Sequence, residues 1–464
     1  MGYDRAWTPS RRMAASLAWA AAALLAAVPS VPGATYYVAQ KDAEAGDGNR
    51  GTEARPWRSL HFGVQQLRPG DTLIVKAGRY YRHTGRRYLP GFAPARSGTR
   101  DKPITIKAKR GEDVMVMGGP TPDTPPAKFT NPAIGSGRDH VIIDGFRVYG
   151  AVAFWKCKGC IARNCEIWGG NDASFNCCIR LEYASGCVIC NNIIHDNDGR
   201  VSAPGAGGSR MNMPLIMEYD SNDGLIEHNE FYNAVGAAVF LKDNARNFTV
   251  RGNLFWGTGG GVLTCVQDTG ENIVVEGNVF RGLTGAAVHA HCSLKGLTVR
   301  NNTFYNNATD IHTWTSGTKN IRIFNNIFAH AAAGQLFLYV APHGSDRNTD
   351  GALTNVLLHD YNCYHGQAVW KVNYRTVARS LAQWRRYGPY GFDKRSFFAA
   401  PKFAAPTKHD FRLAEDCPCR RAGKDGRTIG AHVKGTERIG VDAKTNPWAR
   451  NRMKVDYTPG GRGR

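Results

Sequence analysis

The apolar positions in the middle of the chain repeat with a period of about 24 residues, within the range typical of solenoid repeats. Each copy carries an asparagine, and after a longer first interval the asparagines are almost evenly spaced. An apolar residue stands three positions before each asparagine, and an aliphatic or aromatic residue stands two positions after it. Alternation with a period of two predicts β-strands whose apolar side chains share one face. We call these residues the anchor asparagines: Asn192, Asn229, Asn253, Asn278, Asn302 and Asn326.

A turn of this length cannot bury its own apolar face, so successive turns must stack and supply ladder partners to one another. Asparagine tolerates the left-handed backbone conformation of a tight corner, and stacked asparagine side chains can hydrogen-bond along the stacking axis. The pattern therefore predicts an all-β protein built as a parallel β-helix, a type of solenoid.

The regular coils are expected over residues 139–365. Residues 34–138 are expected to form an N-terminal cap and the first coils, and residues 366–464 an irregular, basic C-terminal segment. The stretch from Ser59 to Leu67 predicts a short amphipathic helix with Ser59 as N-cap and with Leu60, Val64 and Leu67 on one side. Such a helix would close the N-terminal end, because exposed ladder edges invite aggregation.

Residues 1–33 have the pattern of a secretory signal peptide. Arg11 and Arg12 precede an apolar run from Met13 to Val28, which small residues suited to cleavage follow. The run is shorter than the roughly 20 apolar residues of a membrane span. We therefore expect a secreted or periplasmic protein, monomeric and without a membrane span after signal removal.

Composition narrows the class of partner. A hydrophobic content of 42% excludes a disordered chain, and 53 Gly with 22 Pro argue against a helical bundle. The net charge of +21 favours an anionic partner. Because export is expected, an acidic polysaccharide is favoured and nucleic acid is not expected.

The cysteines allow two interpretations. Twelve cysteines in an exported chain permit disulfides, and Cys157-x-x-Cys160 and Cys187-x-x-Cys190 have the spacing of zinc ligands. The repeat, however, places Cys160 and Cys187 at equivalent positions one turn apart. This placement favours stacking or a disulfide over a zinc site.

Several segments resemble secreted right-handed β-helix proteins of the pectate-lyase-like superfamily. The resemblance covers most of residues 36–431, and it implies a right-handed parallel β-helix. The superfamily includes polysaccharide lyases, epimerases and glycoside hydrolases. The resemblance therefore implies the fold but does not single out one activity. The segments that carry it are Tyr36-Tyr37-Val38, Gly51-Thr52 with Pro56-Trp57, Pro69-Gly70-Asp71-Thr72, Ala77-Gly78-Arg79-Tyr80, Asp410-Phe411-Arg412-Leu413 and Ile429-Gly430-Ala431.

Ionisable residues gather on one predicted strip of the solenoid. The positions eleven and thirteen before each anchor are expected to face solvent, because the positions between them are mostly apolar. This places candidate catalytic residues together on the strip, namely Lys242, His289 and His291. The candidate substrate-binding residues are Glu218, Gln267, Asp243 and Arg180.

This strip suits β-elimination on a uronate-containing polysaccharide. The reaction needs a group that neutralises the carboxylate, a base for the adjacent proton and an acid for the departing oxygen. Val239-Phe-Leu-Lys242 resembles the strand that carries the lysine base in chondroitinase B-like and alginate lyases, which implies Lys242 as base. His291 would be the acid or a second base, and His289, Glu218 and Gln267 would position the substrate.

Other functions remain open. A non-catalytic glycan-binding or envelope protein would need only the positive charge of the strip. A glycoside hydrolase or an epimerase could occupy the same fold, but a hydrolase needs two facing carboxylates, and Glu218 is the only carboxylate at the centre of the strip.

Metal ligands are not evident from the sequence. His289 and His291 would form half a site, and His312 is expected to point inward. Calcium, common among related lyases, would need clustered oxygens, and the candidates are Asp42, Glu44 and Asp47, or Asp220 and Asp223. Two insertions of about 13 and 12 residues, near 197–213 and 341–352, would either wall a cleft or decorate the surface.

Overall fold

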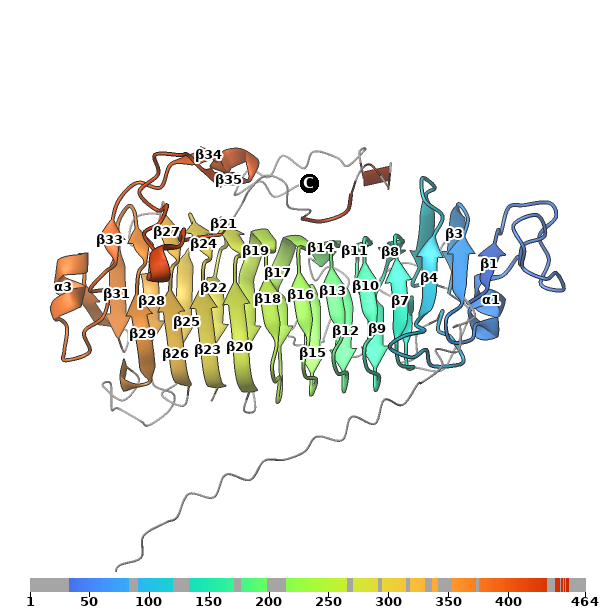
Figure 1. Cartoon of the computed structure of the whole chain (residues 1–464), viewed down its shortest axis with the longest axis horizontal. Coiled ribbons are helices and arrows are strands. Elements are labelled where there is room, and N and C mark those ends of the chain that lie inside the picture. Colours follow the sequence, from blue (N-terminus) through green and yellow to red (C-terminus); the bar gives the residue numbers. More distant parts are fainter. Residues whose placement is uncertain are drawn as a thin grey trace, which may run out of the picture. The chain divides into compact units, whose positions relative to one another are not determined.

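The computed structural model describes residues 33–82, 91–119, 133–170, 177–197, 214–264, 270–290, 294–313, 318–329, 336–340, 353–372, 375–431, 439–442, 444, 446, 448 and 449. The expected signal peptide and the two expected insertions lie outside these residues, apart from Asn197 at the edge of the first insertion. In the described part the chain winds repeatedly through three faces of parallel strands, as a parallel β-helix (Figure 1). None of the helices in this described part is long and apolar enough to cross a membrane.

The first face is a separate sheet of twelve described strands, each paired in parallel with the strand of the next coil. It comprises β1 (Thr35–Val38), β2 (Thr72–Val75), β4 (Ile104–Ala108), β7 (Val141–Asp144), β10 (Ile161–Arg163), β13 (Val188–Cys190), β16 (Leu225–Glu227), β18 (Thr249–Arg251), β20 (Gly270–Glu276), β23 (Leu294–Arg300), β26 (Lys319–Phe324) and β29 (Val356–Asp360).

The second face follows the anchor asparagines. It comprises β3 (Gly78–Tyr81), β5 (Val114–Met117), β8 (Arg147–Tyr149), β11 (Glu166–Trp168), β14 (Ile193–Asn197), the first halves of β17 (Glu230–Leu241) and β19 (Leu254–Thr264), β21 (Val279–Arg281), β24 (Thr303–Tyr305), β27 (Ile327–Ala329), β30 (Cys363–Tyr364) and β33 (Phe397–Phe398).

The third face completes each coil. It comprises β6 (Ile134–Ser136), β9 (Val152–Trp155), β12 (Ile179–Glu182), β15 (Ile216–Tyr219), the second halves of β17 and β19, β22 (Ala286–Ala290), β25 (Thr309–Thr313), β28 (Leu336–Val340) and β31 (Val369–Val372), with β32 (Arg375–Ala378) added antiparallel to β31. Because β17 and β19 run unbroken through the corner, the second and third faces form one continuous sheet.

The anchor asparagines form the predicted hydrogen-bonded ladder inside the coils. Asn253 donates from Nδ2 to Oδ1 of Asn278 at 3.0 Å and to the carbonyl of Ile226 at 2.9 Å. Its backbone N–H donates to the same Oδ1 at 2.9 Å. All six anchors are fully buried, so each amide satisfies backbone groups that would otherwise be orphaned at the corner.

The aromatic residues two positions after the anchors stack in the core. Phe231, Phe255, Phe280, Phe304 and Phe328 follow one another with ring centroids 4.7 to 5.1 Å apart. These spacings match the distance between neighbouring strands, and the rings are at most 1% exposed. The prediction that these positions face the core is confirmed.

The left-handed corner residue is the one before each anchor, and not the anchor itself as expected. His228, Gly252, Gly277, Asn301 and Asn325 have φ between +53° and +66°. The anchor side chain turns inward to join the ladder, so the backbone reverses one residue earlier. We call these residues the corner column.

The N-terminal end is closed as predicted. Helix α1 (Leu60–Gln66) has Ser59 as N-cap, whose side chain accepts a hydrogen bond from the N–H of Phe62. Leu60, Val64 and Leu67 are at most 2% exposed and belong to the main hydrophobic core.

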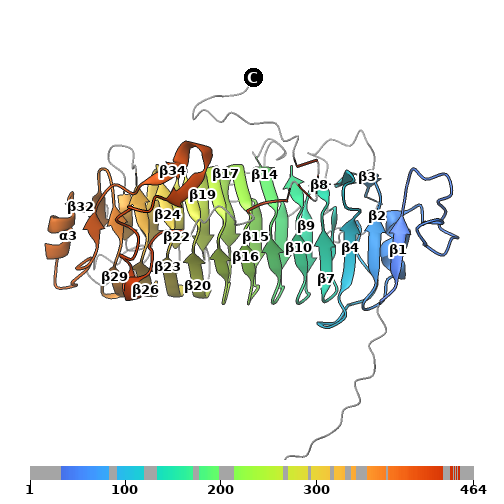
Figure 2. The same cartoon turned by 45° about the horizontal axis from the view of Figure 1, so that its top comes forward.

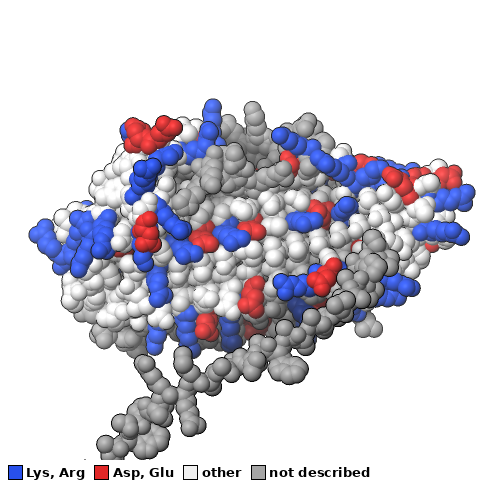
Figure 3. Space-filling model, viewed as in Figure 1, with Lys and Arg blue, Asp and Glu red and all other residues white. Residues whose placement is uncertain are grey.

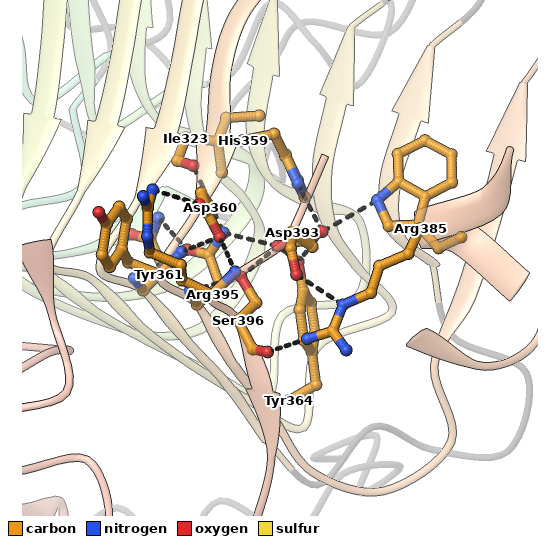
Figure 4. Close-up of polar contacts among 12 residues, drawn as sticks. Ile323, His359, Asp360, Tyr361, Tyr364, Arg385, Asp393, Arg395 and Ser396 are labelled. Carbon is orange, nitrogen blue, oxygen red and sulfur yellow. Dashed lines mark hydrogen bonds and ion pairs between the residues drawn. The ribbon is translucent and has the colours of Figure 1, made fainter. Parts of the chain in front are cut away.

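A buried carboxylate ends the asparagine ladder at the other end (Figure 4). Oδ2 of Asp393 lies 2.7 Å from Nδ1 of His359, and the carboxylate accepts hydrogen bonds from Tyr364 and Ser396. Ser396 in turn accepts the backbone N–H of Asn362 at 2.8 Å, one coil after the last anchor. Asp393, His359 and Ser396 are at most 3% exposed, so we interpret this network as a structural cap.

The segment beyond Gly366 first adds β31, helix α3 (Leu381–Arg386) and β33, and then turns back over the coils (Figure 2). The strands β34 (Phe403–Ala405) and β35 (Asp410–Leu413) form a hairpin whose connection is the short 3-10 helix η3 (Pro406–Lys408), and a second one, η4 (Lys424–Gly426), follows the hairpin. Further on, the N–H groups of Gly430 and Gly440 donate to the carbonyls of Asn325 (2.7 Å) and His228 (2.8 Å). The segment therefore passes over later coils first and earlier coils afterwards, in the reverse of their order along the chain.

Charges alternate along the first face, where blue and red side chains follow each other across the molecule in Figure 3. Arg251 lies 2.7 Å from Glu227 of the preceding coil, and Arg300 lies 2.6 Å from Glu276. Opposite charges directly across neighbouring strands stabilise the pairing and its register. This row is close to neutral and does not account for the strongly basic character of the chain.

Candidate functional site

The third face carries the candidate site. Its strands pair so that one outward column runs from coil to coil, and we call it the outer column. Its members are Arg180, Met217, Phe240, Leu263, His289 and His312. Tyr339 and Lys371 continue it in register.

The expectation that Glu218 and Lys242 share a column is wrong. Glu218 pairs with Leu241, and both side chains are fully buried in the interior. The distance along the chain from an interior position to its anchor differs between coils, because the connection between the third and first faces varies in length. A constant offset from the anchor therefore cannot follow one column. The interior residues are Glu218, Leu241, Thr264, Ala290 and Thr313.

Glu218 is an interior acid rather than a surface ligand. Its Oε1 accepts the N–H of Ser221 at 2.5 Å, and its Oε2 is buried with no hydrogen-bond partner among the described residues. Burial raises the pKa of Glu218 well above its usual range, and the nearby carboxylates of Asp220 and Asp243 act in the same direction. We therefore do not retain Glu218 as a substrate-binding residue.

Replacing Glu218 by Gln is expected to stabilise the protein at pH 8. Since the folded-state pKa is raised, the folded protein binds more protons, and stability falls as pH rises above about 4.5. Gln retains the acceptor for Ser221 and removes the charge, so we expect a gain of about 2 kcal/mol at pH 8 and little change near pH 4.5. Urea unfolding at both pH values measures it, and Glu271→Gln, on an exposed carboxylate, is the control. A gain that does not depend on pH would contradict this assignment.

Lys242 is placed on the outer surface, as expected, but it is engaged by its neighbour. Its Nζ lies 2.8 Å from Oδ2 of Asp243 and 4.9 Å from the ring centroid of Tyr219. Its side chain is 17% exposed, whereas that of Asp243 is nearly buried. The ammonium group is therefore held between the carboxylate of Asp243 and the ring of Tyr219.

His289 and His312 form a stacked pair, which the sequence interpretation missed. Their ring centroids are 4.3 Å apart with an interplanar angle of 11°. The expectation that His312 points inward is wrong, because it pairs with His289 in the outer column. His289 also lines a pocket of about 230 Å³ together with Leu263. The other lining residues are small or aliphatic, and include Gly236, Gly259, Gly260 and Gly285.

The remaining candidates fall in different places. Arg180 lies in the outer column, is 1% exposed and has its Nε 3.3 Å from Glu182. Gln267 and His291 lie outside the described residues.

In the described part of the chain, no group of three or more His, Cys, Asp or Glu side chains is arranged to hold a metal ion. This includes the calcium candidates near Asp42 and Asp220. Cys160 and Cys187 are adjacent across paired strands and buried with Cys157, as the stacking interpretation expected.

A second polar cluster, on the second face, was not anticipated. His195 lies between two carboxylates, with Nδ1 2.8 Å from Asp196 and Nε2 3.5 Å from Glu166. Glu166 also contacts Nε of Arg147 at 2.7 Å. Burial opposes a charge on His195, but its hydrogen bonds to the two carboxylates outweigh burial and raise its pKa. Only strand pairing reveals this cluster, because its members lie in three different coils.

Replacing His195 by Gln is expected to destabilise the protein more at low pH than at high pH. A raised histidine pKa contributes stability that is fully present below about pH 6.5 and is lost as pH rises through the folded-state value. We expect the substitution to lower the free energy of unfolding by on the order of 1 kcal/mol at pH 5.5 and by less at pH 9.

His409 provides a control of opposite sign, measured by unfolding across the same pH range. Burial, together with Arg281 at 3.2 Å, lowers its pKa to about 4. The contribution of His409 to stability is present above pH 6.5 and is lost as pH falls toward 4. A pH dependence of the same sign for His195→Gln and His409→Gln would refute the assignment.

Comparisons with known proteins bear on the fold. The family model described as "Right handed beta helix region" matches residues 206–328. A search of curated proteins finds no match. The pectate lyase Pel9A structure shares 16% identity over 86% of this chain and 96% of its own, with a TM-score of 0.56.

Two further solved structures are similar at lower scores. The GH136 lacto-N-biosidase from Eubacterium ramulus has 12% identity over 79% of this chain and 67% of its own, with a TM-score of 0.48. A PL6 family alginate lyase, AlyGC, has 14% identity over 87% and 59%, with a TM-score of 0.39. The fold that the sequence resemblance implied, a right-handed parallel β-helix, is confirmed.

Proposed function

We propose that the protein acts on an acidic, uronate-containing polysaccharide and cleaves it by β-elimination on the third face. The observation that carries the proposal is the stacked pair of His289 and His312 beside a pocket lined by glycines. The net charge of +21 and the fold shared with a pectate lyase support an acidic polysaccharide as substrate.

The histidine pair suits the two proton transfers. Two positive charges about 4 Å apart repel each other, so the pair favours one charged and one neutral ring. A neutral His289, which lines the pocket, would remove the proton next to the carboxylate. A charged His312 would protonate the glycosidic oxygen as its bond to carbon breaks and the new carbon–carbon double bond forms.

Lys242 is assigned a different role from the base expected from the sequence. Its Nζ is held on the outer surface of the coil beside Asp243, at 2.8 Å. It would neutralise the substrate carboxylate, about 10 Å along the axis from His289 by the strand spacing. His291 and Gln267 stay in the proposal as a further acid and a positioning group.

The test is incubation of the mature protein with alginate, pectate and glycosaminoglycans, with and without calcium. Ultraviolet absorbance reports the unsaturated product. We expect a signal with at least one of these polymers, and the lyase proposal fails for these substrates if none of them gives a signal.

A non-catalytic polyanion-binding role is the second candidate. The net charge of +21 favours it, because a binder needs only positive charge on its surface. Retention of acidic polymers without unsaturated product would support this role over the lyase.

A further inference from the structure

A pocket of about 600 Å³ lies between the corner column and the returning C-terminal segment. Its volume is in the range of small-molecule sites. The coils supply one wall, and Lys424, Asp425, Arg427 and Ile439 supply the other. None of its lining residues belongs to the third face, so it is separate from the candidate lyase site.

The pocket exists because two successive corner positions lack side chains. Gly252 and Gly277 lie between His228 and Asn301 in the corner column, and all four line the pocket. A Cβ added to Gly252 would lie 2.7 Å from the His228 ring, which is too close. The His228 ring therefore covers Gly252, and the open part of the floor is the backbone at Gly277, where an added Cβ would meet nothing closer than 3.7 Å.

The walls carry more positive than negative charge. The lining residues include Arg251, Arg300, Lys424 and Arg427, against Glu276 and Asp425. The side chains of the two coil arginines are 47% and 44% exposed although each is paired with a glutamate, so part of each guanidinium is still open to solvent.

The charges from the C-terminal segment are not neutralised by that segment or by the coils. Lys424 and Arg427 are exposed, and neither forms an ion pair with any residue in the described part of the chain. Lys424 lies 5.9 Å from the ring centroid of Phe324, which with Val279 and Ile439 gives the pocket an apolar edge. Positive charge beside an apolar edge matches a ligand that has both a carboxylate and a C–H face.

We propose that this pocket is a second binding site, for an acidic sugar unit, and that it holds the polymer away from the site of cleavage. The inference rests on the proposed function for the class of ligand, but it does not require turnover. The C-terminal segment would then be part of the binding surface as well as a cover for the coils.

Two kinds of variant test the site. Lys424→Glu with Arg427→Glu reverses the exposed charges. Gly277→Asn fills the floor with a residue that tolerates the left-handed corner, and its Cβ would meet nothing closer than 3.7 Å. The matched control is Gly282→Asn, which has φ +64° and open space around its Cβ and lies outside the pocket.

Tetragalacturonate and tetramannuronate are the probes, titrated calorimetrically at low salt. We expect the charge-reversal and Gly277→Asn variants to weaken binding at one site about tenfold, and the control to match the original protein. Unchanged binding in both pocket variants, or an equal loss in the control, would overturn the inference. The absence of binding of either probe to the original protein would also overturn it.

Turnover is measured separately so that the two proposals fail in different ways. Pocket-dependent binding without unsaturated product would support this site and count against the lyase. Unsaturated product with no effect of the pocket variants on probe binding would do the reverse.

Discussion

Replacing Asn278 by Ala should lower the free energy of unfolding by about 4 kcal/mol. Its Oδ1 accepts the backbone N–H and the side-chain amide of Asn253, and its Nδ2 donates to the carbonyl of Val250 at 2.8 Å and to Asn302 at 3.0 Å. All four bonds are lost together at a fully buried position. Groups on the two neighbouring coils are then left unsatisfied where water does not reach them.

Chemical unfolding, followed by circular dichroism, measures this loss. The control is Asn222→Ala, a half-buried asparagine whose Oδ1 accepts one hydrogen bond, from Ser185 at 2.7 Å. We expect the control to lose about 1 kcal/mol. Equal losses at Asn222 and Asn278 would show that the ladder has no special role.

The ladder should also reveal coupling between coils. Asn278 and Asn302 share a hydrogen bond, so the double alanine variant should lose less than the sum of the two single losses. Strict additivity would mean that each anchor stabilises only its own coil.

Replacing His289 by Gln should reduce turnover by at least about 100-fold while polymer binding stays nearly unchanged. The substitution removes the proposed base but keeps a polar side chain of similar length in the outer column. His312→Gln should have a comparable effect, because the acid acts in the same step. Initial rates of unsaturated product and retention on immobilised polymer provide the two readouts.

The pH profile separates catalysis from positioning. An acid and a base in one step predict a bell-shaped dependence of kcat/KM, and loss of His289 should remove its acidic limb. His61→Gln, in helix α1 at the N-terminal end, is the control and should leave the rate unchanged. A rate unaffected by both His289→Gln and His312→Gln would remove these residues from the site.

Lys242→Met should mainly raise KM if the ammonium group neutralises the substrate carboxylate. Loss of the base, by contrast, would appear in kcat. This variant therefore decides between the role expected from the sequence and the role that the ion pair with Asp243 supports.

The repeat could be recognised in the sequence because every coil must meet the same structural requirements. The anchors and the stacked phenylalanines contact their counterparts one repeat away in the chain, and the capping helix is set by local residues. The residues of the outer column could not be identified from the sequence in the same way. A strand has a period of two, so a change of one residue in a connection exchanges the inward and outward faces.

For this reason the predicted facing of the Glu218 and His312 side chains was wrong, in opposite directions. A constant offset placed Glu218 outside and His312 inside, whereas strand pairing does the reverse. The cluster around His195 was invisible for a related reason, since its residues become neighbours only when three coils are in register.

The amino-acid sequence by itself determined that this chain coils, where the coils repeat and which residues fill their interior. Burial and the corner hydrogen bonds recur once per coil, between equivalent positions of neighbouring coils, and so they require the same residue types at regular intervals. Only the tertiary structure decided which polar side chains share a surface, because the variable connections between faces set the register from one coil to the next.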